Sequence, residues 1–218
     1  MPCALWLRLP GQVLSPYLRL GLTLISRQYD LAKLKSSCRR LVRAHLPVNL
    51  YSARAQLQRR AASLLHGMDD MSGLWEELDC LFLADDERGD RTSLLLGGTA
   101  SGVALPPMPR CGSFAAAGSG TLFLTNIEKL SLAGQHILGR IIEKGHYTPV
   151  GDPYPRTVNC RILVGTARPL REMARDFVIE WRLAELLGHI ALPAEDVIGA
   201  IDAERLSRTH PSNLAAAS

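Results

Sequence analysis

Short apolar segments separated by helical patterns predict an alternation of strands and helices along most of the chain. Each apolar segment has the length of a strand and is bounded by polar or turn-forming residues, which is typical of a buried strand. The predicted strands are Val48–Tyr51, Leu78–Ala84, Thr121–Leu124 and Cys160–Gly165. A hairpin is also predicted, because Tyr147–Val150 and Thr157–Asn159 flank the turn-forming segment Gly151–Pro153.

Apolar residues at helical spacing predict six helices. They are Gln28–Ala44, Ala53–His66, Leu132–Lys144, Pro169–Arg175, Phe177–Leu187 and Ala194–Leu206. In the third helix the spacing places four residues on the inward face, with Leu138 as a further candidate. These four are Leu132, His136, Ile137 and Ile141. Strands that alternate with helices favour an α/β fold with a doubly wound, mostly parallel sheet.

Three segments are predicted as connections or ends. Asp85–Asp90 consists almost entirely of charged residues, which favours a solvated turn. Residues 97–113 are rich in glycine and proline, which favours a loop. From Ser207 the chain is polar and then rich in alanine, so we expect a frayed tail.

Composition is that of a globular protein and leaves one question open. The 218 residues are 47% hydrophobic and 21% charged, which allows a core of useful size. The net charge is +4, and arginine outnumbers lysine by 21 to 4. A GC-rich genome would produce this bias with no functional meaning. An arginine-lined surface for phosphate or nucleic acid would produce it as well.

Cysteine use and hydropathy predict a cytoplasmic protein. The five cysteines form no Cys-x-x-Cys unit, which favours reduced, mostly buried thiols. Charged and proline residues interrupt the apolar N-terminal segment, so we expect no signal peptide. No run of about 18 apolar residues occurs, so we expect no membrane span. The histidines lack metal-ligand spacing with cysteines or carboxylates, and we assign no metal.

The most informative segment is Gly120–Ile127, which reads Gly-Thr-Leu-Phe-Leu-Thr-Asn-Ile. It resembles the Walker B segment Gly-Thr-Leu-Phe-Leu-Asp-Glu-Ile in the central AAA+ domain of bacterial sigma-54-dependent transcription activators. The resemblance continues without a gap through Val158–Ile162 to Gly165–Arg168. Upstream, Leu46–Val48 resembles the family's Leu-Pro-Val strand. The resemblance implies a P-loop NTPase-like (AAA+) fold.

The residues that would carry phosphoryl transfer in such a domain are replaced. The two acidic Walker B positions hold Thr125 and Asn126, and Gln58 stands where the family has its phosphate-binding lysine. Ala167 stands in place of the sensor asparagine. The Walker A glycines, whose backbone N–H groups wrap the phosphates, are also replaced. Their positions hold Ser52, Ala55 and Leu57. Because charge neutralisation and positioning drive phosphoryl transfer, the sequence predicts a pseudo-ATPase.

A remnant nucleotide site is nevertheless implied by the resemblance. Its candidate residues are Ser52, Arg54, Gln58, Arg59, Thr125, Asn126, Arg168 and Arg182. The leading interpretation expects no cofactor. In the alternative, Arg54, Arg59 and Arg60 replace the lysine, and the domain senses ATP or a cyclic dinucleotide in transcription regulation. Arg182 has two interpretations, a surface salt bridge or an arginine that reaches the phosphate of a neighbouring subunit.

The resemblance also implies a domain organisation and a kind of partner. We expect an N-terminal extension over residues 1–25, the AAA+-like domain over 26–206 and a flexible tail over 207–218. We expect the helical lid and a helix-turn-helix unit to be missing, and therefore no direct DNA binding. Leu96–Val103 occupies the place of the sigma-contacting loop but lacks its phenylalanine. The expected partner is a protein, either a sigma-54 activator or further copies of this chain. A decayed gene product is the third interpretation.

Overall fold

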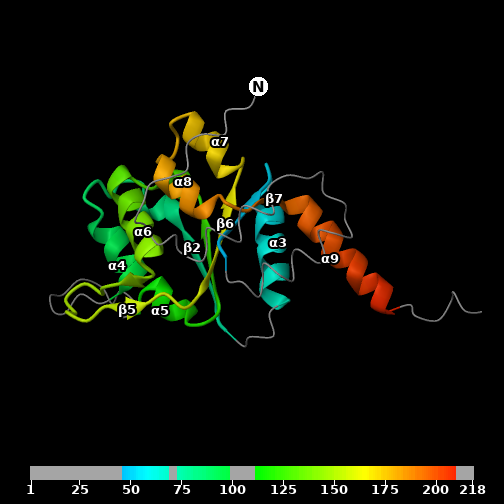
Figure 1. The fold of residues 1–218 in the computed structure, drawn as a ribbon, viewed down its shortest axis with the longest axis horizontal. Coiled ribbons are helices and arrows are strands. Elements are labelled where there is room, and N and C mark those ends of the chain that lie inside the picture. The colour runs from blue at the N-terminus through cyan, green and yellow to red at the C-terminus, as the bar shows by residue number, and fades with distance from the viewer. Residues whose placement is uncertain (1–45, 69–72, 99–110, 210–218) are drawn as a thin grey trace, which may run out of the picture.

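A five-stranded parallel sheet forms the centre of the computed structural model, which describes residues 46–68, 73–98 and 111–209. The sheet has the order β2-β3-β6-β1-β7, and all neighbouring strands run parallel (Figure 1). Its strands are β1 (Val48–Tyr51), β2 (Trp75–Asp79), β3 (Thr121–Thr125), β6 (Arg161–Thr166) and β7 (Ala191–Pro193). The predictions for residues 1–25, for the helix Gln28–Ala44 and for residues 210–218 lie outside the described residues.

Helices connect the strands, and a short antiparallel hairpin precedes β6. The hairpin consists of β4 (His146–Tyr147) and β5 (Arg156–Thr157). The α-helices are α3 (Ala55–Gly67), α4 (Asp90–Gly97), α5 (Ser113–Ala117), α6 (Leu132–Lys144), α7 (Leu170–Arg175), α8 (Trp181–Leu187) and α9 (Ala194–Thr209). Two 3-10 helices, η1 (Cys80–Leu83) and η2 (Ile127–Lys129), follow β2 and β3.

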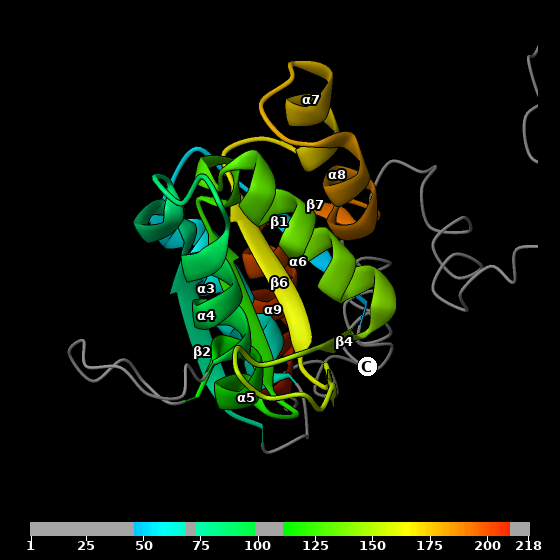
Figure 2. The ribbon, with the colours of Figure 1, turned by 90° about the vertical axis from the view of Figure 1, so that its left-hand side faces the viewer.

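The two faces of the sheet carry separate hydrophobic cores. Helices α3 and α9 cover one face, and α4, α5, α6 and α8 cover the other (Figures 1 and 2). Side chains alternate between the faces along β3. Leu122 and Leu124 enter the core beneath α6 and α8, whereas Phe123 enters the core beneath α3 and α9. This arrangement confirms the predicted α/β fold with a parallel sheet and flanking helices.

Several predicted elements occur where the pattern placed them. The observed bounds of Val48–Tyr51 and Leu132–Lys144 are those predicted. The predicted hairpin is present, but each strand begins one residue before the predicted start and has only two residues, with His146 and Tyr147 opposite Thr157 and Arg156. The predicted helix from Ala194 runs on to Thr209, so it includes the first residues of the predicted tail.

The predicted strand Leu78–Ala84 is misplaced along the chain. The strand is β2, which ends at Asp79, and the chain then turns into η1. The Asp79 carboxylate causes this turn, because its Oδ1 accepts a hydrogen bond of 2.9 Å from the backbone N–H of Leu81. Leu81 and Phe82, which were predicted to lie in the strand, are 52% and 69% exposed.

The predicted inward face of α6 is only partly correct. Leu138 is fully buried and Ile141 packs against the core, whereas Leu132 is 62% exposed and His136 is also exposed. The buried face consists of Gly134, Gln135, Leu138 and Gly139. Gly134 faces α4, because a Cβ there would lie 3.0 Å from Thr92 Oγ1, and Gly139 faces α8, because a Cβ there would lie 3.9 Å from Leu183 Cδ1. Gln135 is satisfied because its Nε2 donates to Leu130 O and its Oε1 accepts from Glu180 N. Periodicity of apolar residues could not reveal a face built from small and polar ones.

The helix predicted over Phe177–Leu187 begins at Trp181 instead. Glu180 caps its first turn by accepting a hydrogen bond of 2.8 Å from Leu183 N. Phe177 lies before it in a left-handed conformation, with φ 58°. The elements α4, α5, η2 and β7 were not predicted. Each is short or lies in a glycine-rich part of the chain.

The predicted solvated turn Asp85–Asp90 contains one buried carboxylate. Asp86 is only 5% exposed, and its Oδ2 accepts hydrogen bonds of 2.7 Å from both the backbone N–H and the hydroxyl of Thr92. Burial acts to raise the pKa of Asp86, but these hydrogen bonds hold the pKa below its usual range. The turn therefore connects η1 to α4 through hydrogen bonds between Asp86 and Thr92.

Candidate functional site

The candidate residues lie at the carboxyl edge of the sheet, where β1, β3 and β6 end. In open α/β sheets, ligands bind in the crevice beyond the carboxyl ends of the strands. Ser52 follows β1, Thr125 ends β3 and Asn126 follows it. Gln58 reaches this edge from the first turns of α3. The structure therefore brings Ser52 and Gln58 together at one end of this edge and Thr125 and Asn126 at another.

Gln58 closes the space between the ends of β1 and β6. Its Nε2 donates hydrogen bonds of 2.7 Å to Ser52 O and 2.8 Å to Thr166 O. The side chain is buried, with 7% exposure. Gly165 makes room for it, because a Cβ at that position would lie 2.7 Å from Gln58 Oε1. An amide at this position therefore binds the protein's own carbonyl groups.

Ser52 is engaged within the protein as well. Its hydroxyl donates a hydrogen bond of 2.6 Å to Glu195 Oε1 at the start of α9 and accepts one of 3.1 Å from Arg54 N. The bond from Ser52 is the main reason that the pKa of Glu195 lies below its usual range. These contacts join the end of β1 to α9, across the place where a P-loop would hold phosphate.

The segment predicted to have replaced the Walker A loop leads directly into a helix. It becomes helical at Ala55, two residues after the predicted start, with Arg54 in an extended conformation before it. Arg54 is exposed beside this helix start. Arg59 points instead to the edge strand β2, where its Nε lies 3.0 Å from Glu77 Oε1. Arg60 pairs with Asp202 of α9 at 2.8 Å.

Asn126 follows the end of β3, at the position predicted to correspond to the second Walker B acid. Asn126 adopts a left-handed conformation with φ 52°, which asparagine tolerates better than most residues. Its Nδ2 donates a hydrogen bond of 2.8 Å to Asp79 Oδ1. Asp79 ends the neighbouring strand β2, in register with Thr125. Sequence reasoning missed Asp79, and only the strand pairing brings it to this site.

A second acid and a thiol lie near Asp79. Glu128 has one buried carboxylate oxygen without a hydrogen-bond partner among the described residues. Burial, with smaller contributions from Asp79 and Glu128, raises the pKa of Cys80 to about 12. A thiol with this pKa stays protonated at neutral pH and is a poor nucleophile or metal ligand. Within the described ranges, no group of three or more histidine, cysteine or acidic residues could hold a metal ion.

A buried polar network supports the end of β6. Asn49 donates from Nδ2 to the Thr166 hydroxyl at 2.7 Å and accepts at Oδ1 from Leu170 N at 3.0 Å. The Thr166 hydroxyl in turn donates to Arg168 O at 2.7 Å. Sequence reasoning missed Asn49, although an asparagine in the middle of a buried strand was a usable signal. The network connects β1, β6 and α7, and its polar atoms are satisfied by each other.

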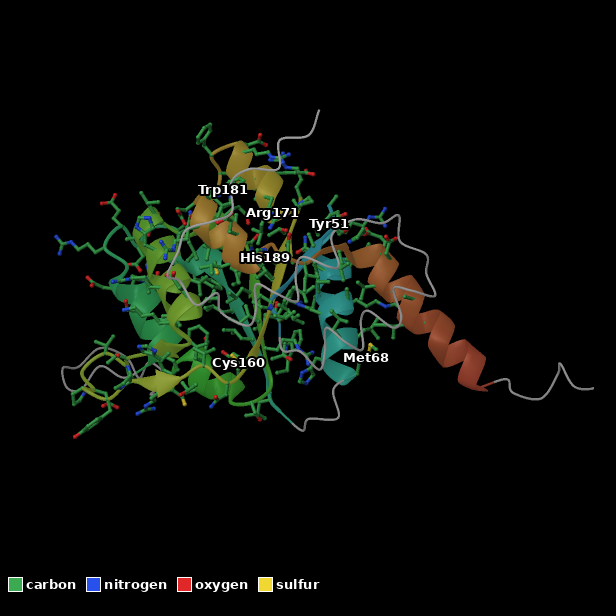
Figure 3. All side chains as sticks on the ribbon, viewed as in Figure 1. Tyr51, Met68, Cys160, Arg171, Trp181 and His189 are labelled. Atoms are coloured by element: carbon green, nitrogen blue, oxygen red, sulfur yellow. The ribbon has the colours of Figure 1, made fainter. Side chains whose placement is uncertain are left out.

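The side chains of the two remaining arginine candidates lie in ion pairs on the surface. Arg168 Nη1 is 2.6 Å from Asp176 Oδ2, and Arg182 pairs with Glu143 of α6. Both arginine side chains are more than half exposed. A third arginine, Arg171, donates to His189 Nδ1 at 2.9 Å on the same side of the sheet as α8 (Figure 3).

Comparisons with known proteins extend this description. Residues 98–187 match the sigma-54 interaction domain family. Over 67 residues the chain is 45% identical to the nitric oxide reductase transcription regulator NorR2 of Cupriavidus necator. It is 46% identical, also over 67 residues, to the anaerobic nitric oxide reductase transcription regulator NorR of Serratia proteamaculans. Each match covers 31% of this chain and 13% of the relative.

Solved structures agree on the fold. The crystal structure of NtrX from Brucella abortus in complex with ATP aligns with 81% of this chain and 41% of its own, at a TM-score of 0.60 and 16% identity. The complex of NtrX with ADP aligns with 88% of this chain and 44% of its own, at a TM-score of 0.58 and 17% identity. At this level of identity the likeness shows the fold alone.

These findings agree on one kind of similarity. Residues 98–187 are similar to the sigma-54 interaction domain, and a segment of 67 residues is similar to the NorR regulators. The fold is the α/β fold with a parallel sheet that NtrX also has. The chain spans only 13% of the length of the curated relatives it matches. Among helices in the described ranges, none has the length and apolar character needed to cross a membrane.

Proposed function

We propose that this chain is a pseudo-ATPase, an AAA+-like domain that does not hydrolyse ATP and acts as a regulatory protein-binding module. The observation that carries the proposal is the position of the Gln58 side chain. Its amide donates to Ser52 O and Thr166 O in a buried space between β1, β6 and α3. A lysine at this position would direct a cation to a nucleotide phosphate, whereas Gln58 stabilises the protein's own backbone.

The residues at the end of β3, where Mg²⁺ would have to bind, also support the proposal of a pseudo-ATPase. In ATP hydrolysis, Mg²⁺ and a positioned water need carboxylates at the end of the Walker B strand. Thr125 supplies a hydroxyl there and Asn126 an amide, which carries no charge to offset that of Mg²⁺. A neighbouring carboxylate oxygen, Oδ1 of Asp79, already accepts hydrogen bonds from Asn126 Nδ2 and Leu81 N. Because Gln58, Thr125 and Asn126 carry no charge, the site lacks the main source of transition-state stabilisation.

The turn between α7 and α8 is our candidate for the protein contact. Phe177 is 96% exposed, and Val178 and Trp181 are 40% and 50% exposed (Figure 3 labels Trp181). Phe177 is held in its left-handed conformation by hydrogen bonds from its own N–H to Ala174 O and from Val178 N to Met173 O. Glycine is the residue that usually occupies such a helix end. At 96% exposure the Phe177 side chain packs little against the described residues, which favours a role in binding.

The nucleotide part of the proposal is tested by titrating the chain with ATP and Mg²⁺ in a calorimeter, followed by an assay for phosphate release. We expect neither binding nor release, while NtrX from Brucella abortus serves as the positive control for nucleotide binding. A Gln58→Lys, Thr125→Asp, Asn126→Glu variant should stay inactive, because the Walker A glycines are still replaced. Micromolar binding with turnover by the natural sequence would overturn the proposal.

The protein-binding part is tested by replacing Phe177. Phe177→Gly should stabilise the chain by about 1 kcal/mol, because glycine adopts the left-handed conformation without the Cβ clash. The same substitution should reduce association with a sigma-54 activator, or with further copies of the chain, measured by co-purification and by size-exclusion chromatography. Tyr154→Ser is the matched control, since Tyr154 is 74% exposed in a different part of the surface. Unchanged association of Phe177→Gly would remove this turn from the interface.

A nucleotide sensor is the second candidate function, and the observation in its favour is Arg54. This arginine is exposed at the start of α3, and the first turn of that helix has no acidic residue. Arg59 and Arg60 support it less, because both are in ion pairs. A thermal shift with ATP or a cyclic dinucleotide that disappears in Arg54→Ala would favour the sensor over the pseudo-ATPase.

A further inference from the structure

A cavity of about 290 Å³ lies between α4, α6 and β4. Because α6 runs back from the carboxyl ends of the strands, its last turns and this cavity lie toward the opposite edge of the sheet from Ser52 and Gln58. Figures 1 and 2 both show α4 beside α6, with the hairpin below them. We call this cavity the α6 pocket. None of the residues that line the α6 pocket belongs to the candidate nucleotide site.

Well-packed elements form the walls of the α6 pocket. At one end of α4, Gly89 has φ 77°, and a Cβ there would lie 2.2 Å from the Ile137 side chain. At the other end, a Cβ on Gly97 would lie 3.4 Å from the Tyr147 ring. The Tyr147 ring stacks on Phe114 with centroids 5.3 Å apart. These contacts set the spacing between α4, α6 and β4, so the pocket is a feature of the packed fold.

Three basic side chains line the α6 pocket. Arg140 and Lys144 are four residues apart on α6, and His146 follows in β4. Among the described residues that line the pocket, none is acidic. Glu143, on the same helix, is paired with Arg182. Within the described part of the chain, Arg140 and Lys144 form no ion pair that would offset their repulsion.

Helix electrostatics accounts for part of this cluster. A cation in the last turn of a helix is stabilised by the helix dipole, which explains Lys144 at the end of α6. A second cation four residues earlier is a like-charge pair that costs a few tenths of a kcal/mol in an isolated helix. The side chain of Arg140 is one turn further from the helix end. An anion between the two side chains would turn this repulsion into attraction.

We propose that the α6 pocket binds inorganic phosphate or a small phosphomonoester. Arg140 and Lys144 each contribute a positive charge, and His146 contributes an imidazole. This set of side chains suits the two negative charges of a phosphate dianion better than the single charge of a carboxylate ligand. Ser93 and Thr148 add hydroxyl groups to the lining, and Ile137 and Ile141 form an apolar wall for the ester group. The volume lies at the lower end of the range for small-molecule sites, which limits the ligand to a small one.

The test is calorimetric titration of the full chain with inorganic phosphate and with glycerol phosphate, at constant ionic strength with chloride as the balancing anion. We expect saturable binding of at least one of them. Arg140→Gln and Lys144→Gln should each weaken binding by about tenfold or more, since each removes a charge-assisted hydrogen bond. Arg175→Gln is the matched control, because Arg175 is exposed on α7, away from the pocket, and should bind normally.

Three results would overturn the proposal. One is the absence of saturable binding at millimolar concentrations of both ligands. The second is an equal loss in Arg175→Gln, which would indicate a general effect of net charge. The third is tighter binding of a DNA duplex that depends on Arg140 and Lys144, which would assign the cluster to a nucleic-acid surface. Thermal melting of all three variants checks that folding is unchanged. Because Gln58 and Ser52 take no part, these outcomes are independent of the ATP experiment.

Discussion

The middle of the sheet and its carboxyl edge respond to different constraints in this molecule. In the middle, β3 and β6 contribute residues alternately to two cores, and Phe123, Leu163 and Val164 are fully buried. At the edge, Ser52, Gln58 and Asn126 bind neighbouring protein groups instead of projecting toward a ligand. Side chains in the middle of the sheet must fit the packing of the hydrophobic core on one face or the other. Residues at the edge need only satisfy their polar atoms, so several different side chains are compatible with the fold.

The largest expected effect tests the middle of the sheet. Phe123 is fully buried and packs against Trp75, with ring centroids 5.6 Å apart. Phe123→Ala should lower the free energy of unfolding by about 3–5 kcal/mol, because it removes a large buried side chain and leaves a cavity. Urea denaturation measures this change. Tyr154→Ala, at an exposed position, is the control and should stay within about 0.5 kcal/mol of the natural chain.

A smaller effect is expected at the carboxyl edge. Gln58→Leu keeps the approximate volume but leaves Ser52 O without its partner, so it should lower the free energy of unfolding by about 1–3 kcal/mol. Gln56→Leu is the matched control, because Gln56 is exposed on the same helix. If Gln58→Leu proved as stable as the control, Gln58 would have no structural role, and the contrast between edge and middle would lose its main support.

The smallest effect concerns the buried Asp86 and depends on pH. Its pKa is lowered in the folded chain, so the stability it contributes is present above its unfolded pKa of about 4 and is lost as the pH falls through the folded pKa. Thr92→Val removes one of its hydrogen bonds and should cost about 1–2 kcal/mol at pH 7. That difference between variant and natural chain should shrink below about pH 4, as measured by denaturation at several pH values. A difference independent of pH would mean that the Thr92 effect is one of packing.

Sequence patterns predicted the middle of the sheet better than the helix faces. Val48–Tyr51 and Thr121–Leu124 are apolar segments bounded by turns, and burial of such segments leaves few alternatives to a strand. The inward face of α6 was predictable only in part, since glycine and glutamine share it with Leu138. Leu81 and Phe82 were predicted to lie in a strand because their segment is apolar, yet β2 ends at Asp79, whose carboxylate accepts a hydrogen bond from Leu81 N. The hydrogen bond from Leu81 N to Asp79 Oδ1 favours a turn at a place where the apolar residues alone predicted a strand.

The sequence by itself determined the alternation of strands and helices and the likeness to sigma-54 activators, and on that likeness it predicts that the charged residues of phosphoryl transfer are replaced. These properties depend on residue type and spacing along the chain. Only the tertiary structure decided which partners the replacing residues have. Gln58 reaches Thr166 across 108 positions, and Asn126 reaches Asp79 across 47. Contacts of this kind exist because the parallel sheet places the carboxyl ends of distant strands side by side, which no local pattern specifies.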